Sequence, residues 1–338
     1  MRAFLDPRQT KHNPQSFLVL GQQRVSPEQP ERITRLKAGA EAAGCVFEAP
    51  EDAGIAQIAA IHTSEYLSFL QTIHGRWQAL DGASDEVIPN IHARARTDSY
   101  PTSPVGQAGY HQADTACPIG AHTWDAAYWS AQSAIGGARA LGEEECAYVL
   151  SRPPGHHAYH DQAGGFCFLN NAAIAAQDLQ EQGARVAILD VDVHHGNGTQ
   201  GIFETRSDVL TVSIHADPDA FYPFYWGHAH ERGIGDGLGA NLNIPLPRGT
   251  QDDAYLEALA HALQRIQGFG CDAVVVALGL DTSIDDPFQG FAVTDQGFAR
   301  IGAAIAAMGL PTLYVQEGGY MSDALGPNLT QVLIAAQG

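Results

Sequence analysis

The stretch Arg185–Gln200 reads RVAILDVDVHHGNGTQ, and its pattern decides the fold class. The apolar run Val186–Leu189 predicts a strand that is buried on both faces, as in a parallel sheet. Two aspartates and two histidines follow it within six residues: Asp190, Asp192, His194 and His195. Burying four such groups is costly unless something compensates them, and ligands of α/β proteins bind at the carboxyl ends of strands. The stretch therefore predicts a functional site at this edge of a sheet.

Asp192 and His194 lie two residues apart, so their side chains point to the same side near the end of the strand. A carboxylate beside an imidazole is a typical ligand pair for a divalent metal ion, with zinc the first candidate. A turn that caps the strand, with hydrogen-bonded and partly exposed histidines, would also explain these residues. The stretch alone leaves both interpretations open.

From about residue 122 the sequence alternates between apolar runs typical of buried strands and patterns typical of helices. Strands separated by helices indicate an α/β domain with a mostly parallel central sheet flanked by helices. We expect one such domain over residues 1–338. The predicted strands are 146–150, 186–191, 209–214, 273–279 and 312–316, and the predicted helices are 33–44, 55–80, 123–141, 168–182, 252–267 and 293–308.

Two long segments lack regular periodicity. Residues 81–118 are rich in Gly, Pro, Ser and Asp, and residues 217–247 are rich in Gly, Pro and aromatic side chains. A loop this long inside a compact domain is usually functional or disordered. Because the first segment also carries Tyr100, Tyr110 and His111, we expect an ordered loop insertion at about 81–118 that contributes to a site or a subunit contact.

The composition restricts the partners and the compartment. The chain has 38 Asp plus Glu against 18 Lys plus Arg, a formal net charge of −20, which argues against a nucleic acid as the main partner. We expect no signal peptide, and no run approaches the roughly 20 apolar residues of a membrane span, so we expect no membrane partner. Five scattered cysteines without paired metal spacing favour reduced thiols in the cytoplasm: Cys45, Cys117, Cys146, Cys167 and Cys271.

Polar and ionisable residues follow each of the five predicted strands. The segments are Arg152–His157, Asp190–His195, His215–Pro218, Leu280–Pro287 and Glu317–Tyr320. The carboxyl ends of parallel strands meet at one edge of a sheet, so these segments can converge on one pocket. Chance would explain one or two such ends, whereas five in succession favour a common site.

The residues in these segments suit metal-dependent amide hydrolysis. Asp192, His194 and Asp281 offer two carboxylates and one imidazole, three protein ligands of the kind that catalytic zinc binds while keeping one position open. The adjacent His156 and His157 are the natural base and acid, because histidine titrates in the working pH range. Tyr320 would stabilise the carbonyl oxygen as it becomes negative. A structural histidine pair and a packed tyrosine at a strand end are the alternatives. The full set is Asp192, His194, Asp281, His156, His157 and Tyr320.

Six segments in this order resemble the arginase–deacetylase superfamily, and within it the zinc-dependent histone deacetylases and the bacterial acetylpolyamine amidohydrolases. They read RPPGHHA, GGFCFLNNAAIAA, ILDVDVHHGNGTQ, VSIHADP, LGLDTSIDDP and EGGY, and the resemblance covers roughly residues 100–320. It implies the arginase/deacetylase fold, with long loops at the C-terminal edge of the sheet. An arginase-type dimanganese site would require aspartates in place of the Gly-Asn-Gly after His195, and these are absent from the sequence.

The resemblance implies a role for each site residue. The implied zinc ligands are Asp192, His194 and Asp281. His157 would act as general base and then as acid, with His156 as its electrostatic partner. Tyr320 would polarise the scissile carbonyl, and Asp190 and Asn197 would orient the two histidines.

A substrate tunnel and a second cation are also implied. The residues that match the tunnel lining are Gly165, Phe166, Tyr222 and Phe288. A structural potassium ion would be held by backbone carbonyls and by groups of Asp190, Asp192, His194 and Ser213. A narrow aromatic tunnel suits a thin aliphatic chain ending in an amide, while core packing is the alternative role for the three aromatic residues.

The sequence leaves the substrate open. Residues 81–118 resemble the loop that narrows the entrance and forms the dimer contact in acetylpolyamine amidohydrolases, which implies a homodimer or a higher homo-oligomer. That branch places acidic residues at the tunnel mouth for a distal ammonium group, whereas Phe17 and Ala121 or His122 stand near those positions here. Three aspartates could supply the charge instead: Asp98, Asp114 and Asp217.

The leading hypothesis is a zinc-dependent amidohydrolase that removes acetyl or other small acyl groups from aminoalkyl amides such as acetylpolyamines. The alternatives in the same class are a protein acetyl-lysine deacetylase and a hydrolase of another small aryl or neutral amide. A different class is a metal-dependent protein that binds acylated or cationic ligands without turning them over.

Overall fold

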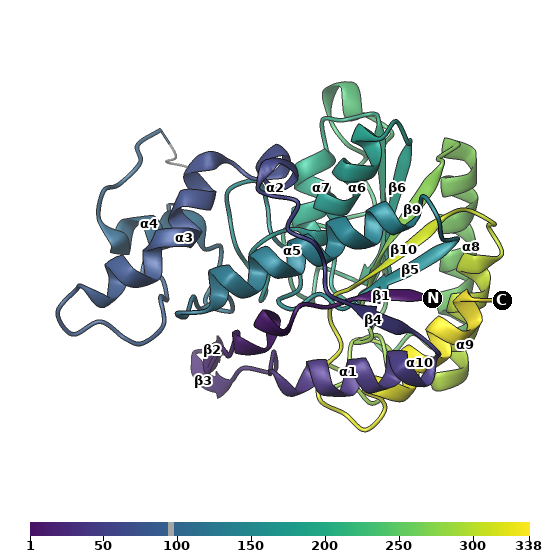
Figure 1. Ribbon diagram of the computed structural model, residues 1–338, viewed down its shortest axis with the longest axis horizontal. Coiled ribbons are helices and arrows are strands. Elements are labelled where there is room, and N and C mark those ends of the chain that lie inside the picture. The colour runs from purple at the N-terminus through teal and green to yellow at the C-terminus, as the bar shows by residue number, and fades with distance from the viewer. Residues whose placement is uncertain (94–97) are drawn as a thin grey trace.

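The computed structural model describes residues 1–93 and 98–338, and within them eight parallel strands form one central sheet (Figure 1). The strands are β1 (Arg2–Phe4), β4 (Val46–Glu48), β5 (Cys146–Val149), β6 (Val186–Asp190), β7 (Val209–Ala216), β8 (Asn241–Leu246), β9 (Ala273–Leu278) and β10 (Thr312–Gln316). Their order across the sheet is β4-β1-β5-β10-β9-β6-β7-β8. The predicted α/β class with a parallel sheet is therefore confirmed.

Helices cover both faces of the sheet. They are α1 (Glu31–Ala42), α2 (Ala56–Ile61), α3 (Ser64–Gln78), α4 (Pro104–His111), α5 (Thr123–Ala140), α6 (Asn171–Glu181), α7 (Asn197–Phe203), α8 (Asp252–Phe269), α9 (Asp295–Ala306) and α10 (Leu325–Ala336). Apolar residues of α1, α8, α9 and α10 pack in one core, and those of α2, α3, α5 and α6 pack in the other. None of the described helices combines the length and the apolar composition that a membrane span requires.

The apolar strand β9 shows why these sequences form a doubly covered sheet. Successive side chains of a strand point to opposite faces. Val274 and Val276 accordingly lie in the core of α1, α8, α9 and α10, whereas Val275 and Ala277 lie in the opposite core. All four side chains are buried, so every second apolar residue contributes to a different layer.

Two predicted elements differ from the structure. The predicted helix 55–80 is two helices, because His62 is extended and the Thr63 side chain accepts a hydrogen bond from the Tyr66 amide, which caps a new helix at Ser64. The predicted loop 81–118 contains α4, which begins at a proline typical of a first helical turn. Residues 94–97 of that segment lie outside the described residues.

Several elements were not predicted, and most are short or polar. The turn-rich first 30 residues contain β1, which joins the central sheet, and a two-stranded hairpin, β2 (Ser16–Val19) and β3 (Gln22–Val25). The edge strands β4 and β8 have partly exposed or polar side chains, so their period is weak. The helices α7 and α10 were also missed. Because β8 begins at Asn241, the predicted loop 217–247 was wrong at its C-terminal end.

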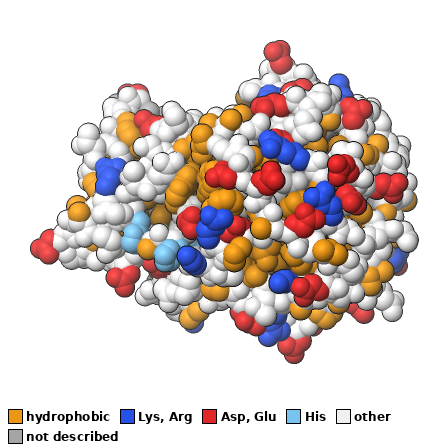
Figure 2. Space-filling view, viewed as in Figure 1, with side chains coloured by type: hydrophobic (Ala, Val, Ile, Leu, Met, Phe, Trp, Pro, Cys, Tyr) orange, Lys and Arg blue, Asp and Glu red, His pale blue; other side chains and the backbone are white. Residues whose placement is uncertain are grey.

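The arrangement of the layers leaves one side of the molecule irregular. In Figure 1 the helices α3 and α4 project away from the sheet, with the β2–β3 hairpin below them, and both chain termini lie at the opposite side. The terminal amino group of Met1 donates a hydrogen bond to Gln337 Oε1 at 3.1 Å. Figure 2 shows acidic and basic side chains interspersed on the face of the molecule drawn there.

Candidate active site

The five polar segments predicted to converge do so at the carboxyl edge of the sheet. The central strands β5, β10, β9 and β6 are neighbours and run parallel, so the chain leaves each of them at the same edge. Asp192, His194, Asp281 and both histidines at 156 and 157 are buried there. Groups distant in sequence are thereby brought within hydrogen-bond distance of one another.

Asp192, His194 and Asp281 form a compact group of potential metal ligands. One ligand atom from each residue lies within 4.8 Å of the other two. His194 Nδ1 is 3.1 Å from Asp192 Oδ1 and 3.1 Å from Asp281 Oδ2. Burial, and then the neighbouring carboxylate of Asp192, raise the pKa of Asp281 to about 6. Two buried carboxylates and an imidazole are a donor set that fits a zinc ion with an open position.

Backbone groups fix the orientation of both carboxylates. The Val193 amide donates to Asp281 Oδ1 at 3.0 Å, and the Gly318 amide donates to Asp192 Oδ2 at 2.8 Å. A Cβ atom at Gly318 would overlap both carboxylates. Glycine is therefore required at this position, because the backbone approaches the carboxylates too closely for any side chain.

His156 and His157 are adjacent in sequence but have different partners. Their ring centroids are 4.0 Å apart. His156 Nδ1 is 2.9 Å from Asp190 Oδ2, and His157 Nδ1 is 2.6 Å from Asn197 Oδ1. Burial opposes protonation of His156, but Asp190 and Asp192 outweigh it and raise its pKa to about 10. Burial and the neighbouring His156 lower the pKa of His157 instead, so one ring is charged and the other neutral.

The neutral state of His157 defines which nitrogen is free. Asn197 Nδ2 donates to the Tyr159 hydroxyl at 3.0 Å, which directs its carbonyl oxygen toward His157. An amide oxygen only accepts hydrogen bonds, so Nδ1 of His157 carries the proton and Nε2 is available as a base. Tyr159 was not predicted as a site residue, although it directly follows the segment RPPGHHA.

Tyr320 lies at the inner end of the cavity wall. Its backbone amide donates to Asp286 Oδ2 at 2.9 Å, and its ring contacts those of Phe166 and Phe288. Burial raises the pKa of Tyr320 well above its ordinary value, so the phenol remains a hydrogen-bond donor. Arg32 packs behind it, with the guanidinium carbon 5.0 Å from the ring centroid.

Arg32 was not predicted as a site residue. It is fully buried and donates to the backbone oxygens of Gly319 at 2.7 Å and Glu317 at 2.6 Å, which fixes the loop that carries Tyr320. In the sequence it stands in an ordinary helical pattern, where an arginine is normally solvent-exposed. No local signal distinguishes it from its neighbours in α1.

A cavity of about 390 Å³ leads to these groups. Its lining includes His157, His194 and Tyr320 at the inner end. The four residues expected in the tunnel all line it: Gly165, Phe166, Tyr222 and Phe288. The remaining lining residues come from the β2–β3 hairpin (Phe17, Leu18, Val19 and Leu20), from Asp114, Thr115 and Ala116, and from Phe224. The walls are therefore largely apolar and aromatic.

Gly165 is a position in this wall where a side chain has no room. Its φ is +50°, and a Cβ atom there would overlap the His157 ring and lie 3.0 Å from the Tyr222 hydroxyl. Phe166 follows it with a φ of +70°, in the left-handed region that costs a bulky residue free energy. This backbone conformation turns the Phe166 ring toward Phe17 and Tyr320.

Among the described residues that line the cavity, Asp114 is the one with a carboxylate side chain. Its Oδ2 accepts hydrogen bonds from the Tyr222 hydroxyl at 2.6 Å and from the Gly165 amide at 3.1 Å. The other residues considered for the tunnel mouth do not line the cavity: Asp98, Ala121, His122 and Asp217. Of the three aspartates that the sequence offered, the structure brings Asp114 to the cavity.

Ser213 lies beside Asp190 on the neighbouring strand β7. Its hydroxyl oxygen is 3.2 Å from His195 Nδ1 and 2.8 Å from His215 Nδ1. These contacts connect Ser213 to a second, buried histidine pair behind the metal-ligand group.

Comparisons with known proteins identify the family of the chain. Residues 26–336 match the histone deacetylase domain. An acetylpolyamine amidohydrolase of Burkholderia pseudomallei is 49% identical over 97% of this chain and 96% of its own, and acetylpolyamine amidohydrolase 1 of Pseudomonas aeruginosa is 45% identical over 97% and 96%. A crystal structure of acetylpolyamine aminohydrolase from Burkholderia pseudomallei gives a TM-score of 0.95 at 48% identity, covering 98% of this chain and 97% of that chain. The chain therefore belongs to the histone deacetylase family and is an amide-hydrolysing deacetylase.

Proposed function

We propose that this enzyme is zinc-dependent and removes acetyl or other small acyl groups from aminoalkyl amides such as acetylpolyamines. The observation that carries the proposal is the apolar cavity that ends at His157, His194 and Tyr320 and has Asp114 in its wall. The names of the relatives that cover nearly the whole chain support the same substrate class.

Asp192, His194 and Asp281 hold the metal ion in this proposal. The support is the chemistry of the donor set, since two buried carboxylates face one imidazole nitrogen at 3.1 Å and need a cation to compensate them. A zinc ion supplies a charge that polarises the substrate carbonyl and lowers the pKa of water toward about 7.

His157 moves the proton. Its free Nε2 takes a proton from the attacking water and later delivers it to the nitrogen of the leaving amine, while Nδ1–H stays bonded to Asn197. His156, held by Asp190, remains charged and gives the pair a positive charge beside the reacting atoms. The opposite pKa shifts of the two rings support this division between base and electrostatic partner.

Tyr320 donates a hydrogen bond to the carbonyl oxygen, which becomes negative as water adds. Such a donor is typically worth several kcal/mol, about 2.7–4, when it is positioned in advance in a site that excludes water. The contacts of its ring with Phe166 and Phe288 and the position of Arg32 behind it support a fixed orientation.

The apolar walls and Asp114 select the substrate. Phe166, Tyr222 and Phe288 surround the aliphatic chain and exclude water, and Asp114 attracts the ammonium group of an aminoalkyl amide. A protein substrate is the less favoured alternative, because four residues of the β2–β3 hairpin add to the cavity lining and enclose a thin chain.

A substrate screen tests the proposed function. The purified, zinc-loaded protein is incubated with acetylated diamines and polyamines, acetyl-lysine peptides and aryl acetamides, and the released amine is measured. We expect the acetylated aminoalkyl amides to be turned over fastest, with inhibition by a hydroxamate chelator. Faster turnover of acetyl-lysine peptides or aryl acetamides would mean that these, rather than aminoalkyl amides, are the preferred substrates. Ligand binding without release of amine over hours would favour a binding protein.

Three further parts of the proposal concern assembly, location and a second ion. A homodimer through residues 81–118 is supported by exposed apolar side chains in that segment, Ile91 and Tyr100, and light scattering would test it.

A cytoplasmic location is supported by the five unpaired cysteines. Potassium bound by Asp190, Asp192, His194 and Ser213 stays a prediction, which metal analysis would check.

A further inference from the structure

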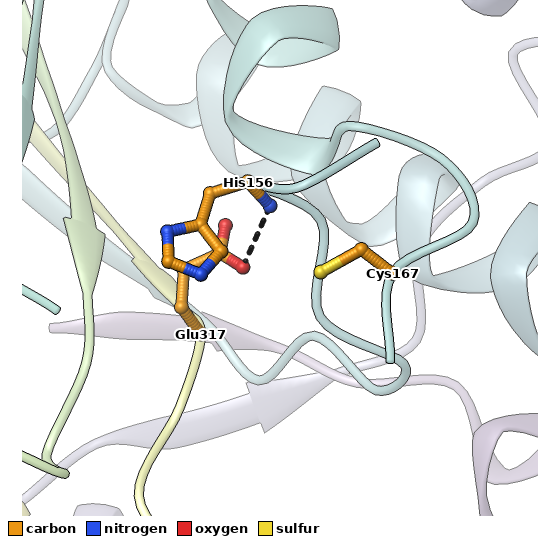
Figure 3. A group of neighbouring side chains, drawn as sticks. All are labelled: His156, Cys167 and Glu317. Carbon is orange, nitrogen blue, oxygen red and sulfur yellow. Dashed lines mark hydrogen bonds between the residues drawn. The ribbon is translucent and has the colours of Figure 1, made fainter. Parts of the chain in front are cut away.

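A second group of buried ionisable side chains includes one member of the histidine pair. It consists of His156, Cys167 and Glu317, and one ligand-type atom of each lies within 4.8 Å of the others (Figure 3). The proposed reaction gives no role to Glu317, which follows β10 directly and is fully buried. A buried carboxylate requires partners, so the partners of Glu317 indicate what it does.

The Glu317 carboxylate binds the backbone at the start of the histidine pair. Its Oε2 accepts hydrogen bonds from the Gly155 amide at 2.6 Å and from the His156 amide at 3.1 Å, the second of which is drawn in Figure 3. Its Oε1 has no hydrogen-bond partner among the described residues. One oxygen therefore holds two consecutive amides of the turn that precedes the rings of His156 and His157.

Glu317 is itself fixed at both backbone positions. Its amide donates to the Leu278 oxygen at 2.9 Å, and its carbonyl accepts from Arg32 at 2.6 Å. The side chain thus connects the rigid end of the central sheet to the histidine turn. On the other side of that turn, a Cβ atom at Gly155 would overlap the backbone of Leu169–Asn171. The turn is held between this backbone and the Glu317 carboxylate.

The contacts of this group are mainly hydrogen bonds to atoms outside it. His156 Nδ1 is already bonded to Asp190, and Oε2 of Glu317 is already bonded to the two amides. The Cys167 thiol lies 3.4 Å from the Gly165 oxygen. Burial raises the pKa of this thiol, and a thiol binds metal as the thiolate.

We propose that Glu317 is a positioning residue for amide hydrolysis: by accepting the amides of Gly155 and His156, its carboxylate sets where the two histidine rings stand relative to the metal ligands. The inference rests on the proposed function of the histidine pair. A displacement of about 1 Å in a catalytic group can reduce the rate about 100-fold, so a fixed turn matters for turnover more than for binding.

Two substitutions of similar volume test this role. Glu317→Met removes the acceptor, and Glu317→Gln keeps one acceptor oxygen without the charge. With N-acetyl-1,4-diaminobutane, we expect kcat to fall about 100-fold in E317M and about 10-fold or less in E317Q, with KM within about threefold in both. Cys167→Ala opens space in the same group without removing an acceptor from the amides, and we expect its kcat to stay within about threefold of the parent enzyme.

Readouts that do not depend on turnover accompany the kinetics. Zinc content and hydroxamate affinity should be unchanged in E317M and in E317Q. Hydrogen exchange at the Gly155 and His156 amides should accelerate in E317M and much less in E317Q. Equal losses in E317M and E317Q, or unchanged exchange in E317M, would overturn the proposal.

The remaining outcomes are also decisive. If E317M does not fold, E317Q decides alone, and a loss of more than about 100-fold in kcat there would contradict a role based on the acceptor oxygen. If the parent enzyme does not release amine from any acylated substrate, the proposed function fails, while the exchange measurements still judge the part that Glu317 has in fixing the turn.

Discussion

Two buried groups of side chains lie at the same edge of the sheet and have similar donor atoms. The first group is Asp192, His194 and Asp281, and the second group is His156, Cys167 and Glu317. In the first group, His194 Nδ1 faces only carboxylate oxygens, and His194 lines the cavity. In the second group, Oε2 of Glu317 and Nδ1 of His156 have partners outside the group, and none of the three residues lines the cavity. The difference teaches that contact with the cavity, rather than residue type, separates the proposed metal site from the second group, since carboxylates of both groups accept hydrogen bonds from backbone amides.

Burial raises the pKa of a carboxyl group in both groups. Burial and the like charge of Asp192 raise the pKa of Asp281 to about 6, although the neighbouring His194 opposes the shift. Burial raises the pKa of Glu317 to about 7, but the charge of His156 and two backbone amides oppose the shift. The pKa shifts therefore do not separate the two groups, whereas contact with the cavity does, because His194 lines the cavity and no residue of the second group does.

The largest effect is expected from Asp281→Ala, which breaks the first group. Removing one of three ligands should reduce zinc content from about one ion per chain to below about 0.1 and abolish turnover. Metal analysis and amine release measure both effects. Full zinc occupancy in this variant would mean that the ion is held elsewhere.

His157→Ala should have the next largest effect and separates chemistry from metal binding. General acid–base catalysis contributes typically about 10²–10⁴-fold, so kcat should fall by about 10³. Zinc content should stay the same, because His157 is not in the first group. A parallel loss of zinc would show that the division between ligands and acid–base residues is wrong.

Asp114→Asn should have a smaller effect, confined to cationic substrates. Loss of one charge contact in a partly wet cavity is worth about 1 kcal/mol, so KM for an acetylated diamine should rise about fivefold to tenfold. A neutral alkyl acetamide of the same length serves as the control and should show an unchanged KM. Equal effects on both substrates would indicate that Asp114 only holds Tyr222 and Gly165 in place.

Cys167→Ser should have the smallest effect, and it tests whether the second group binds a metal ion. If the second group binds no cation, zinc content should remain near one ion per chain at saturating zinc, as in the parent protein. Inductively coupled plasma analysis after gel filtration measures the ratio. A fall from two ions to one would assign a metal to the second group.

Much of the candidate site could be predicted because its residues stand next to strands with strong periodicity. The ends of β6, β9 and β10 carry Asp192, His194, Asp281 and Tyr320, and parallel strands place such ends together without knowledge of side-chain geometry. Tyr159, Arg32 and Glu317 could not be predicted as positioning residues. Their roles arise from contacts with residues far away in the sequence, such as those of Arg32 with Glu317 and Gly319.

The outer strands of the sheet and one helix boundary could not be predicted from the sequence either. Central strands are buried on both faces and read as apolar runs, whereas β1, β4 and β8 are short or partly polar and gain their conformation from the neighbouring strand. The break between α2 and α3 depends on one capping threonine, which the continuing apolar period conceals.

The sequence by itself determined the parallel α/β class, the chemical types of the proposed metal and acid–base groups, and the edge of the sheet where they meet. These features follow from local periodicity and from the order of strands and polar segments along the chain. Only the tertiary structure decided which aspartate enters the cavity, which histidine is neutral, and which buried group contributes to the cavity lining. These properties depend on distances of a few ångströms between distant segments, because hydrogen bonding and burial, and not residue type, determine charge and access.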